Sequence, residues 1–244
     1  MLLSQLQSLR QSGKKMFALL VDPDRHTGDS LARMAEQFDG PSGPDIVLVG
    51  GSLLFSSIDD AVSIIRQHTS KPVFLFPGNM MQISEKADGI LLLSLISGRN
   101  PDLLIGQHVL AAPRLAKSGL EILPTGYMLI GEENYTSVRY MSNTMPIPYN
   151  KADIAVATAL AGQMLGLKAV YLEGGSGAVK PVSAEMVKAV RSAIDIPIIV
   201  GGGLRTENDV TTALKAGADV VVVGTSVEDN SLTMEQIASV VRQF

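Results

Sequence analysis

The sequence contains no cysteine among its 244 residues, which excludes disulfide bonds and thiolate metal sites. This absence fits a reducing environment, and we expect a cytoplasmic protein. Basic runs are also lacking and the net charge is −4, which argues against nucleic acid as the main partner. Small molecules are therefore the expected partners.

Long apolar runs are absent as well. No stretch approaches the ~20 apolar residues needed to cross a bilayer, so no transmembrane segment is expected. The polar segment 1–15 lacks the apolar core and the cleavage site of a secretion signal. Hydrophobic residues nevertheless make up 46% of the chain and charged residues 18%, which indicates a folded, soluble protein.

Eight short apolar runs recur along the chain, mostly separated by segments with helical periodicity. Because the runs do not alternate with polar residues, each is expected to be buried on both faces, as parallel strands are. Together with a length close to the roughly 250 residues of one barrel domain, this pattern predicts a single (β/α)8 TIM barrel over residues 1–244. The runs are Met16–Val21, Ile46–Gly50, Val73–Phe76, Ile90–Leu95, Glu121–Pro124, Ala169–Leu172, Ile198–Val200 and Val220–Val223.

Several connections carry helix signals. Ser183 and Thr206 are expected N-caps, and Gly217 suits a left-handed C-terminal cap. The segment 151–165 is also expected to be a helix that packs one apolar stripe on the barrel. That stripe contains Ile154, Ala157, Ala161 and Leu165.

Two connections depart from the pattern. Residues 77–89 begin with Pro-Gly-Asn and leave little room for a covering helix, so an irregular crossover is expected between strands three and four. Residues 126–150 contain Tyr127, Tyr135, Tyr140 and Tyr149, and this segment is interpreted as a lid or a subunit contact.

Three glycine-rich segments follow the last three strands. In a TIM barrel the active site lies at the carboxyl ends of the strands, and glycines let backbone amides approach a phosphate. Single glycine clusters are usually structural turns, but three at adjacent strand ends predict a phosphate cup. The segments are Glu173–Gly177, Gly201–Gly203 and Gly224–Ser226.

Acidic and hydroxyl side chains at the same edge suggest the chemistry. Asp22 directly follows the first strand and either serves a magnesium-bound phosphate or caps a turn. Ser52, after the second strand, is a candidate ligand of a metal or a diphosphate. Glu173 is either a proton acceptor for a substrate hydroxyl or a capping or salt-bridging residue, and Tyr171 either contacts the same ligand or belongs to the core. The three histidines show no metal-ligand spacing.

The ordered set of these segments, which spans nearly the whole chain, resembles the geranylgeranylglyceryl phosphate synthase family, particularly its larger archaeal and bacterial group. The Tyr-Leu-Glu-Gly-rich segment is the most specific part. The matching segments are Val21-Asp22-Pro23-Asp24, Gly50-Gly51-Ser52, Pro77-Gly78-Asn79, Tyr171-Leu172-Glu173-Gly174-Gly175-Ser176-Gly177 and Gly201-Gly202-Gly203-Leu204-Arg205.

The resemblance implies transfer of a polyprenyl group, geranylgeranyl in the first instance, from its diphosphate to the 3-hydroxyl of sn-glycerol 1-phosphate. It implies that Asp22 and Ser52 hold Mg2+ and that Glu173 accepts the hydroxyl proton. Lys14 is a weaker candidate for the substrate. The glycerol 1-phosphate positions implied by the resemblance are Tyr171, Leu172, Glu173, Gly174, Gly175, Ser176, Gly177, Gly202, Gly203, Gly224 and Thr225.

The resemblance also gives the missing crossover helix a purpose, since a gap in the outer ring leaves an apolar groove for the prenyl chain. Candidate neighbours of that chain are Phe76, Met80, Met81 and Ile83. A homodimer or homohexamer is implied, and the lipid product suggests transient contact with a membrane surface.

Two other functions stay open at this point. A sugar-phosphate isomerase or related barrel shares the phosphate loops after strands seven and eight. A noncatalytic phosphate-binding or assembly protein would use Tyr135, Tyr140 and Met141 only for subunit contacts. Turnover of a prenyl diphosphate and a glycerol phosphate would exclude both.

Overall fold

Eight parallel strands form a closed barrel in the computed structural model, which describes residues 1–131, 136–176 and 178–244. The ring runs β4-β3-β2-β1-β9-β8-β7-β5 and is closed by direct pairing of β4 with β5, which confirms the predicted (β/α)8 barrel. A two-residue strand, β6, pairs only with the end of β5. The strands are β1 (Met16–Val21), β2 (Ile46–Val49), β3 (Val73–Leu75), β4 (Gly89–Leu95), β5 (Glu121–Gly131), β6 (Ile147–Pro148), β7 (Ala169–Glu173), β8 (Ile198–Gly201) and β9 (Val220–Val223).

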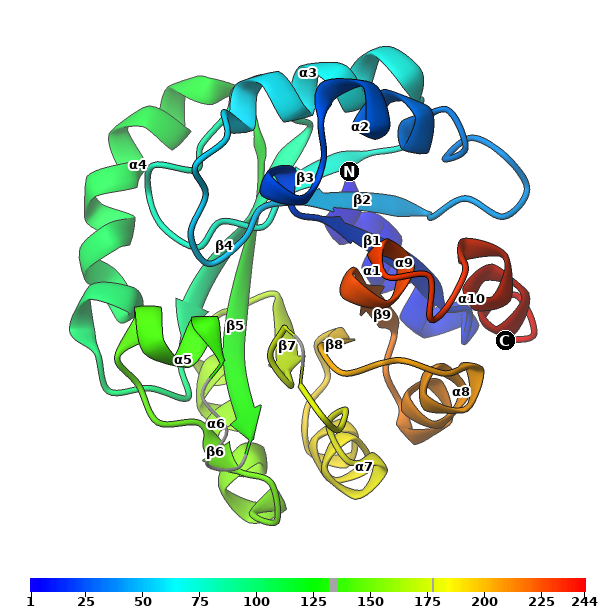
Figure 1. The fold of residues 1–244 in the computed structure, drawn as a ribbon. Helices are drawn as coiled ribbons and strands as arrows, with labels where there is room; N and C mark the ends of the chain where they lie inside the picture. Colours follow the sequence, from blue (N-terminus) through cyan, green and yellow to red (C-terminus); the bar gives the residue numbers. More distant parts are fainter. Residues whose placement is uncertain (132–135, 177) are drawn as a thin grey trace.

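Helices surround the strands and cover most of the barrel (Figure 1). Successive residues of each strand point alternately into the barrel and toward these helices. In β1, for example, Phe17 and Leu19 belong to the outer core, whereas Met16 and Ala18 belong to the inner one. The helices are α1 (Leu2–Ser12), η1 (Pro23–Arg25), α2 (Gly28–Ala35), α3 (Ile58–His68), η2 (Asp102–Gly106), α4 (Gln107–Ser118), α5 (Ser137–Ser142), α6 (Ala152–Met164), α7 (Ala184–Ala193), α8 (Glu207–Ala216), α9 (Thr225–Glu228) and α10 (Met234–Val241).

Helix α1 covers the amino-terminal end of the barrel. Leu2 and Leu6 are buried against the inner core. The Glu121 carboxylate, at the start of β5, accepts hydrogen bonds from the backbone N–H groups of Leu2 at 2.7 Å and Leu3 at 3.0 Å. These are donors of the first helical turn, which have no partner within the helix. The barrel is therefore closed at this end and opens at the carboxyl ends of its strands.

The predicted helix caps are confirmed. The Ser183 side chain accepts a hydrogen bond from the N–H of Met186, and Thr206 forms a capping box with Asp209 at the start of α8. Gly217 ends α8 in the left-handed region with φ 118°. The Ser183 and Thr206 caps fix where α7 and α8 begin and so fix two loops at the open end, whereas Gly217 lies at the closed end.

The crossover between β3 and β4 contains no helix, as the Pro-Gly-Asn sequence predicts. Its backbone is held instead by two glutamine side chains. The Gln82 amide donates to the carbonyl of Gly51 at 2.8 Å and accepts from the N–H of Gly78 at 3.0 Å. The Gln107 oxygen, on α4, accepts from the N–H of Met80 at 2.9 Å. An irregular segment is stable here because side-chain amides satisfy its backbone groups.

One predicted boundary is wrong. Strand β5 does not end at Pro124 but continues to Gly131, and Tyr127 therefore lies in the barrel interior rather than in a lid or subunit contact. Pro-Thr-Gly is typical of a strand end, yet Thr125 is fully buried here and Gly126 lies against the side chains of Ile96 and Leu167. Close packing around these two small residues keeps the strand straight through the apparent turn.

The predicted buried face of α6 is also wrong. Its buried positions are Ala155, Ala159 and Gly162, so the stripe that contains Ile154, Ala157 and Ala161 faces outward. The helix is apolar on nearly every side, and small residues are what allow it to lie close to the barrel. Among the described residues, no helix is long and apolar enough to span a bilayer.

Candidate active site

Glu173 is a buried carboxylate at the open end of the barrel. It ends β7, and its side chain is only 5% exposed. Alternation along this strand sends Tyr171 and Glu173 toward the barrel interior, whereas Leu172 packs in the outer core. Leu172 can therefore contribute only backbone groups to a ligand in the mouth. The carboxylate accepts a hydrogen bond of 2.6 Å from the N–H of Gly175.

Two tyrosines hold this carboxylate from below. The hydroxyls of Tyr127 and Tyr171 both donate hydrogen bonds to Glu173. The tyrosine rings lie 5.4 Å apart, and the ring of Phe76 is 5.1 Å from that of Tyr171. Burial raises the pKa of Glu173 above the usual glutamate value, although the hydrogen bonds from Gly175 and the tyrosines oppose the shift. While it is ionised, such a carboxylate is a stronger base than an exposed glutamate.

Two positions beside Glu173 require glycine, because neighbouring side chains approach their backbone closely. A Cβ at Gly201 would lie 2.0 Å from the Tyr171 hydroxyl oxygen. Gly202 has φ 80°, and a Cβ there would lie 2.3 Å from Oε1 of Glu173. Any side chain at these positions would displace the tyrosine or the carboxylate, so the glycines shape the site as well as the turn.

The three glycine-rich loops meet at one cavity in the barrel mouth. The hydroxyls of Ser176 and Thr225 lie 3.4 Å apart across it. Gly174 lies behind this cavity against the backbone of Gly202, and Gly175 against Thr136. Gly177 lies outside the described residues. Of the predicted glycerol 1-phosphate residues, those that line the cavity are Tyr171, Glu173, Ser176, Gly202, Gly203, Gly224 and Thr225.

Asp22 and Ser52, which follow β1 and β2, line the same cavity; Asp22 lies next to the cup because β1 pairs with β9. Oδ1 of Asp22 accepts a hydrogen bond from the N–H of Asp24 and so caps the helical turn η1, whereas Oδ2 lies 3.7 Å from Nε of Arg25. Burial is the main cause that raises the pKa of Asp22, and the charge of Glu228 adds to it. Turn capping and a ligand role are therefore compatible, because each uses a different oxygen.

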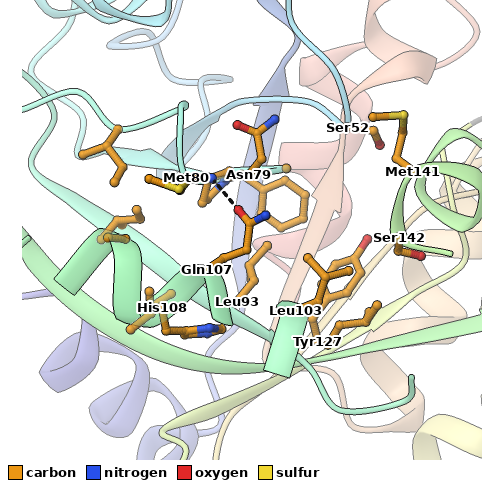
Figure 2. A pocket seen from close by; sticks show the side chains of 18 of the residues that line it. Ser52, Asn79, Met80, Leu93, Leu103, Gln107, His108, Tyr127, Met141 and Ser142 are labelled. Carbon is orange, nitrogen blue, oxygen red and sulfur yellow. Dashed lines mark hydrogen bonds between the residues drawn. The ribbon is translucent and has the colours of Figure 1, made fainter. Parts of the chain in front are cut away.

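An apolar groove joins the mouth at Ser52. It runs through the gap left by the missing helix, between the crossover, β4 and α4 (Figure 2), and has a volume of about 930 Å3 including the part open to solvent. Gly51, Ser52, Phe76, Tyr127 and Val138 line both the groove and the mouth. The site is thus a polar cup continuous with an apolar groove.

Part of the groove lining was predicted from the sequence. Phe76, Met80 and Ile83 line it as predicted, but Met81 does not and is largely exposed. Lys14 precedes β1 and so lies at the closed end of the barrel, away from the mouth. Asp22, Ser52 and Glu173, predicted from strand ends far apart in the sequence, line one cavity.

Several site residues were missed. Tyr127 was hidden by the misplaced end of β5, although its spacing from the apolar residues of the strand could have revealed it. Arg25 and Glu228 line the mouth through loops whose meeting no local pattern indicates. The far wall of the groove comes from Leu103 on η2 and from Gln107 and His108 at the start of α4, where the His108 ring and the Ser94 hydroxyl form a 3.0 Å hydrogen bond.

Solved structures resemble the chain in both fold and sequence. The (S)-3-O-geranylgeranylglyceryl phosphate synthase from Thermoplasma acidophilum, solved in complex with its substrate sn-glycerol-1-phosphate, has a TM-score of 0.92 and 32% identity, covering 99% of this chain and 98% of that one. Thiamine phosphate pyrophosphorylase from Pyrococcus furiosus, at 14% identity and a TM-score of 0.55, shares the fold alone.

Relatives of known name carry the same enzyme name as the solved Thermoplasma acidophilum structure. A geranylgeranylglyceryl phosphate synthase from Spirosoma linguale is 53% identical over 241 residues, which cover 98% of this chain and 96% of that protein. The enzyme of the same name from Pyrococcus abyssi is 42% identical, covering 89% and 86%. The model of the PcrB family matches residues 10–243. The chain therefore belongs to the PcrB family, and the resemblance to geranylgeranylglyceryl phosphate synthases that its sequence carries is confirmed.

Proposed function

We propose that the protein is a prenyltransferase that joins a polyprenyl diphosphate, with geranylgeranyl as the expected chain, to the 3-hydroxyl of sn-glycerol 1-phosphate. The observation that carries this proposal is the continuity of a glycine-lined cup, a buried carboxylate and an apolar groove. A sugar-phosphate isomerase acts on a small polar substrate and does not require the apolar groove. A noncatalytic binding protein does not require a buried carboxylate held by two tyrosines. The names of the relatives support the same function.

Glycerol phosphate would lie with its phosphate against the cup. Backbone amides around Gly202, Gly203 and Gly224, the N–H at the start of α9 and the Thr225 hydroxyl are the donors that support this placement. The 3-hydroxyl would then face Glu173, the carboxylate closest to the cup. Positioning of this kind turns an encounter of two substrates into a reaction within one complex.

In the transfer step the glycerol oxygen forms a bond to the first carbon of the prenyl chain. The bond between that carbon and the diphosphate oxygen breaks, and its electron pair leaves with the diphosphate. Glu173 accepts the hydroxyl proton, so the products are the ether, diphosphate and a protonated carboxyl group. The raised pKa of Glu173 makes it a stronger base than an exposed glutamate while it is ionised.

Asp22 and Ser52 would hold Mg2+ against the diphosphate. Carboxylate and hydroxyl oxygens suit this hard cation, which commonly uses one or two carboxylates together with waters and substrate phosphates. When bound, Mg2+ stabilises the negative charge that develops on the leaving diphosphate.

The prenyl chain would occupy the groove. Its walls are built mainly from apolar residues of the crossover, β4, η2 and α4, among them Ile83, Leu93 and Leu103. Each buried methylene contributes about 0.8 kcal/mol to binding, so a long chain gains most of its affinity here. We further propose that the protein acts in the cytoplasm and contacts a membrane surface transiently as its lipid product leaves.

A direct test incubates the purified protein with Mg2+, geranylgeranyl diphosphate and sn-glycerol 1-phosphate. Mass spectrometry should identify the ether-linked product, and inorganic diphosphate should appear in equal amount. If neither product forms at any chain length of the prenyl donor, the proposed function is wrong.

Asp22→Asn should sharply reduce turnover while leaving the affinity for glycerol phosphate nearly unchanged, because Asp22 faces the diphosphate side of the mouth. Asparagine keeps the oxygen that caps η1, so the fold should persist. Kinetics and calorimetry separate the two effects, and Asp29→Asn, an exposed position on the next helix, is the matched control. Normal Mg2+-dependent turnover in Asp22→Asn would show that the residue only caps the turn.

Glu173→Gln should preserve the fold and the binding of both substrates but slow the single-turnover rate about 10²- to 10⁴-fold, the usual contribution of a general base. Glutamine can still accept the hydrogen bond from Gly175 but cannot take the proton. Thermal melting checks folding, and the exposed Glu185→Gln serves as the control. An effect confined to substrate affinity would identify Glu173 as a positioning residue instead.

Tyr127→Phe should move the acidic limb of the pH–rate profile to higher pH. The tyrosine hydroxyl stabilises the ionised carboxylate and lowers its pKa, so its removal raises the pKa of Glu173 further. The base is active when ionised, and a larger fraction is then protonated at any given acidic pH. The profile of Tyr140→Phe, an exposed residue, should match the wild type. A Tyr127→Phe limb at the wild-type position would contradict this role.

We also propose that the protein is a homodimer or homohexamer. Tyr127 is buried in the barrel and cannot take part, but Tyr140 and Met141 on α5 are exposed and suit an interface. Tyr135 lies outside the described residues. Light scattering at micromolar concentration should give a mass of two or six chains, and Tyr140→Ser should weaken the assembly. A monomeric mass for the wild type would reject the proposal.

A further inference from the structure

Arg25 lies at the barrel mouth between two acidic side chains. It ends η1, directly after Asp22 and β1, and lines the same cavity as Ser52 and Thr225. Its Nη1 lies 3.1 Å from Oε2 of Glu228, and its Nε lies 3.7 Å from Oδ2 of Asp22. The side chain is 47% exposed. A guanidinium carries five N–H donors, so these two ion pairs leave donors that can face a ligand in the cavity.

Glu228 fixes the guanidinium in place. It lies on α9, directly beyond the phosphate cup, and its side chain is largely buried. Its other oxygen is 3.8 Å from Nε2 of His26, so the carboxylate is held between two groups of the β1–α2 connection. A planar, held guanidinium loses less freedom on binding an anion than a free lysine would.

The carboxylates around the mouth would repel a prenyl diphosphate, and the Arg25 guanidinium offsets that repulsion. The charged side chains that line the cavity, among the described residues, are Asp22, Arg25, Glu173, Arg205 and Glu228. Arg205 directly follows the glycines of the phosphate cup, whereas Arg25 is next to Asp22. Arg25 lies between Asp22 and Glu228, so without it these two carboxylates would face an anionic ligand uncompensated.

We infer that Arg25 binds the diphosphate of the prenyl donor beside Asp22 and Ser52 and holds the inorganic diphosphate after the carbon–oxygen bond breaks. This inference rests on the proposed function. The guanidinium fork matches pairs of phosphate oxygens and stays charged at every relevant pH. Glu228 is a positioning residue that orients Arg25 and has no contact of its own with the reacting atoms.

A purely structural role is the competing explanation, in which Arg25 only neutralises Asp22 and Glu228. The two roles predict different results for inorganic pyrophosphate, which carries the diphosphate chemistry without the prenyl chain. Calorimetry with sodium pyrophosphate, performed with EDTA and again with Mg2+, therefore tests the role of Arg25 independently of turnover.

Arg25→Gln should weaken pyrophosphate binding about tenfold or more in both conditions, the size expected for a lost charge-assisted contact. Binding of sn-glycerol 1-phosphate should weaken less than that of pyrophosphate, since Arg25 lies beside Asp22 and meets the helix of the cup only through Glu228. Arg25→Lys keeps the charge but not the fork and should lie between the two, and Arg33→Gln, an exposed arginine on α2, should match the wild type. In kinetics, the Arg25→Gln change should raise the KM for the prenyl diphosphate and the inhibition constant of pyrophosphate together.

Pyrophosphate affinity of Arg25→Gln within twofold of the wild type would overturn the inference, whatever its melting temperature. If Arg25→Gln does not fold, the comparison of Arg25→Lys with the wild type decides: equal affinities reject the role of the fork. Failure of the proposed function has a different signature, because the wild-type protein would then yield no ether product. Wild-type turnover with an unaltered Arg25→Gln would reject the assignment of Arg25 alone.

Discussion

Pairing of β4 with β5 is the interaction on which the rest of the molecule depends. These two strands share seven registered positions, from Gly89 opposite Glu121 to Leu95 opposite Tyr127, whereas β3 and β4 share only two. The ring is therefore weakly joined where the outer helix is missing and strongly joined on the next side. Closure by β4 and β5 keeps the carboxyl ends of all eight strands at one mouth while the wall beside β3 opens into a groove.

The centre of the site combines two properties that oppose each other. Burial disfavours the ionised form of Glu173, and the hydrogen bonds from Gly175, Tyr127 and Tyr171 favour it. The tyrosines can reach the carboxylate only because Gly201 and Gly202 have no side chains. These two glycines thus leave the space that Tyr171 and the carboxylate occupy.

Much of the fold could be predicted because its signals are local. Continuous apolar runs marked the strands, Ser183 and Thr206 marked helix starts, and Pro-Gly-Asn marked the missing helix. The errors arose where tertiary packing overrides a local signal. Thr125 and Gly126 look like a turn but are buried in a strand, and α6 is apolar on so many sides that its sequence does not show which face is buried. In the site, the strand ends could be anticipated, whereas Tyr127, Arg25 and the wall from α4 depend on contacts between distant segments.

The closed end of the barrel also governs the order of events in a catalytic cycle. Below Glu173 the interior is filled with tyrosine, phenylalanine and aliphatic side chains, and α1 covers the far opening with Leu2 and Leu6. In the mechanism that we propose, a proton taken up by Glu173 would therefore return to bulk water through the mouth, where the products would lie. Recovery of the base would then accompany the departure of the products.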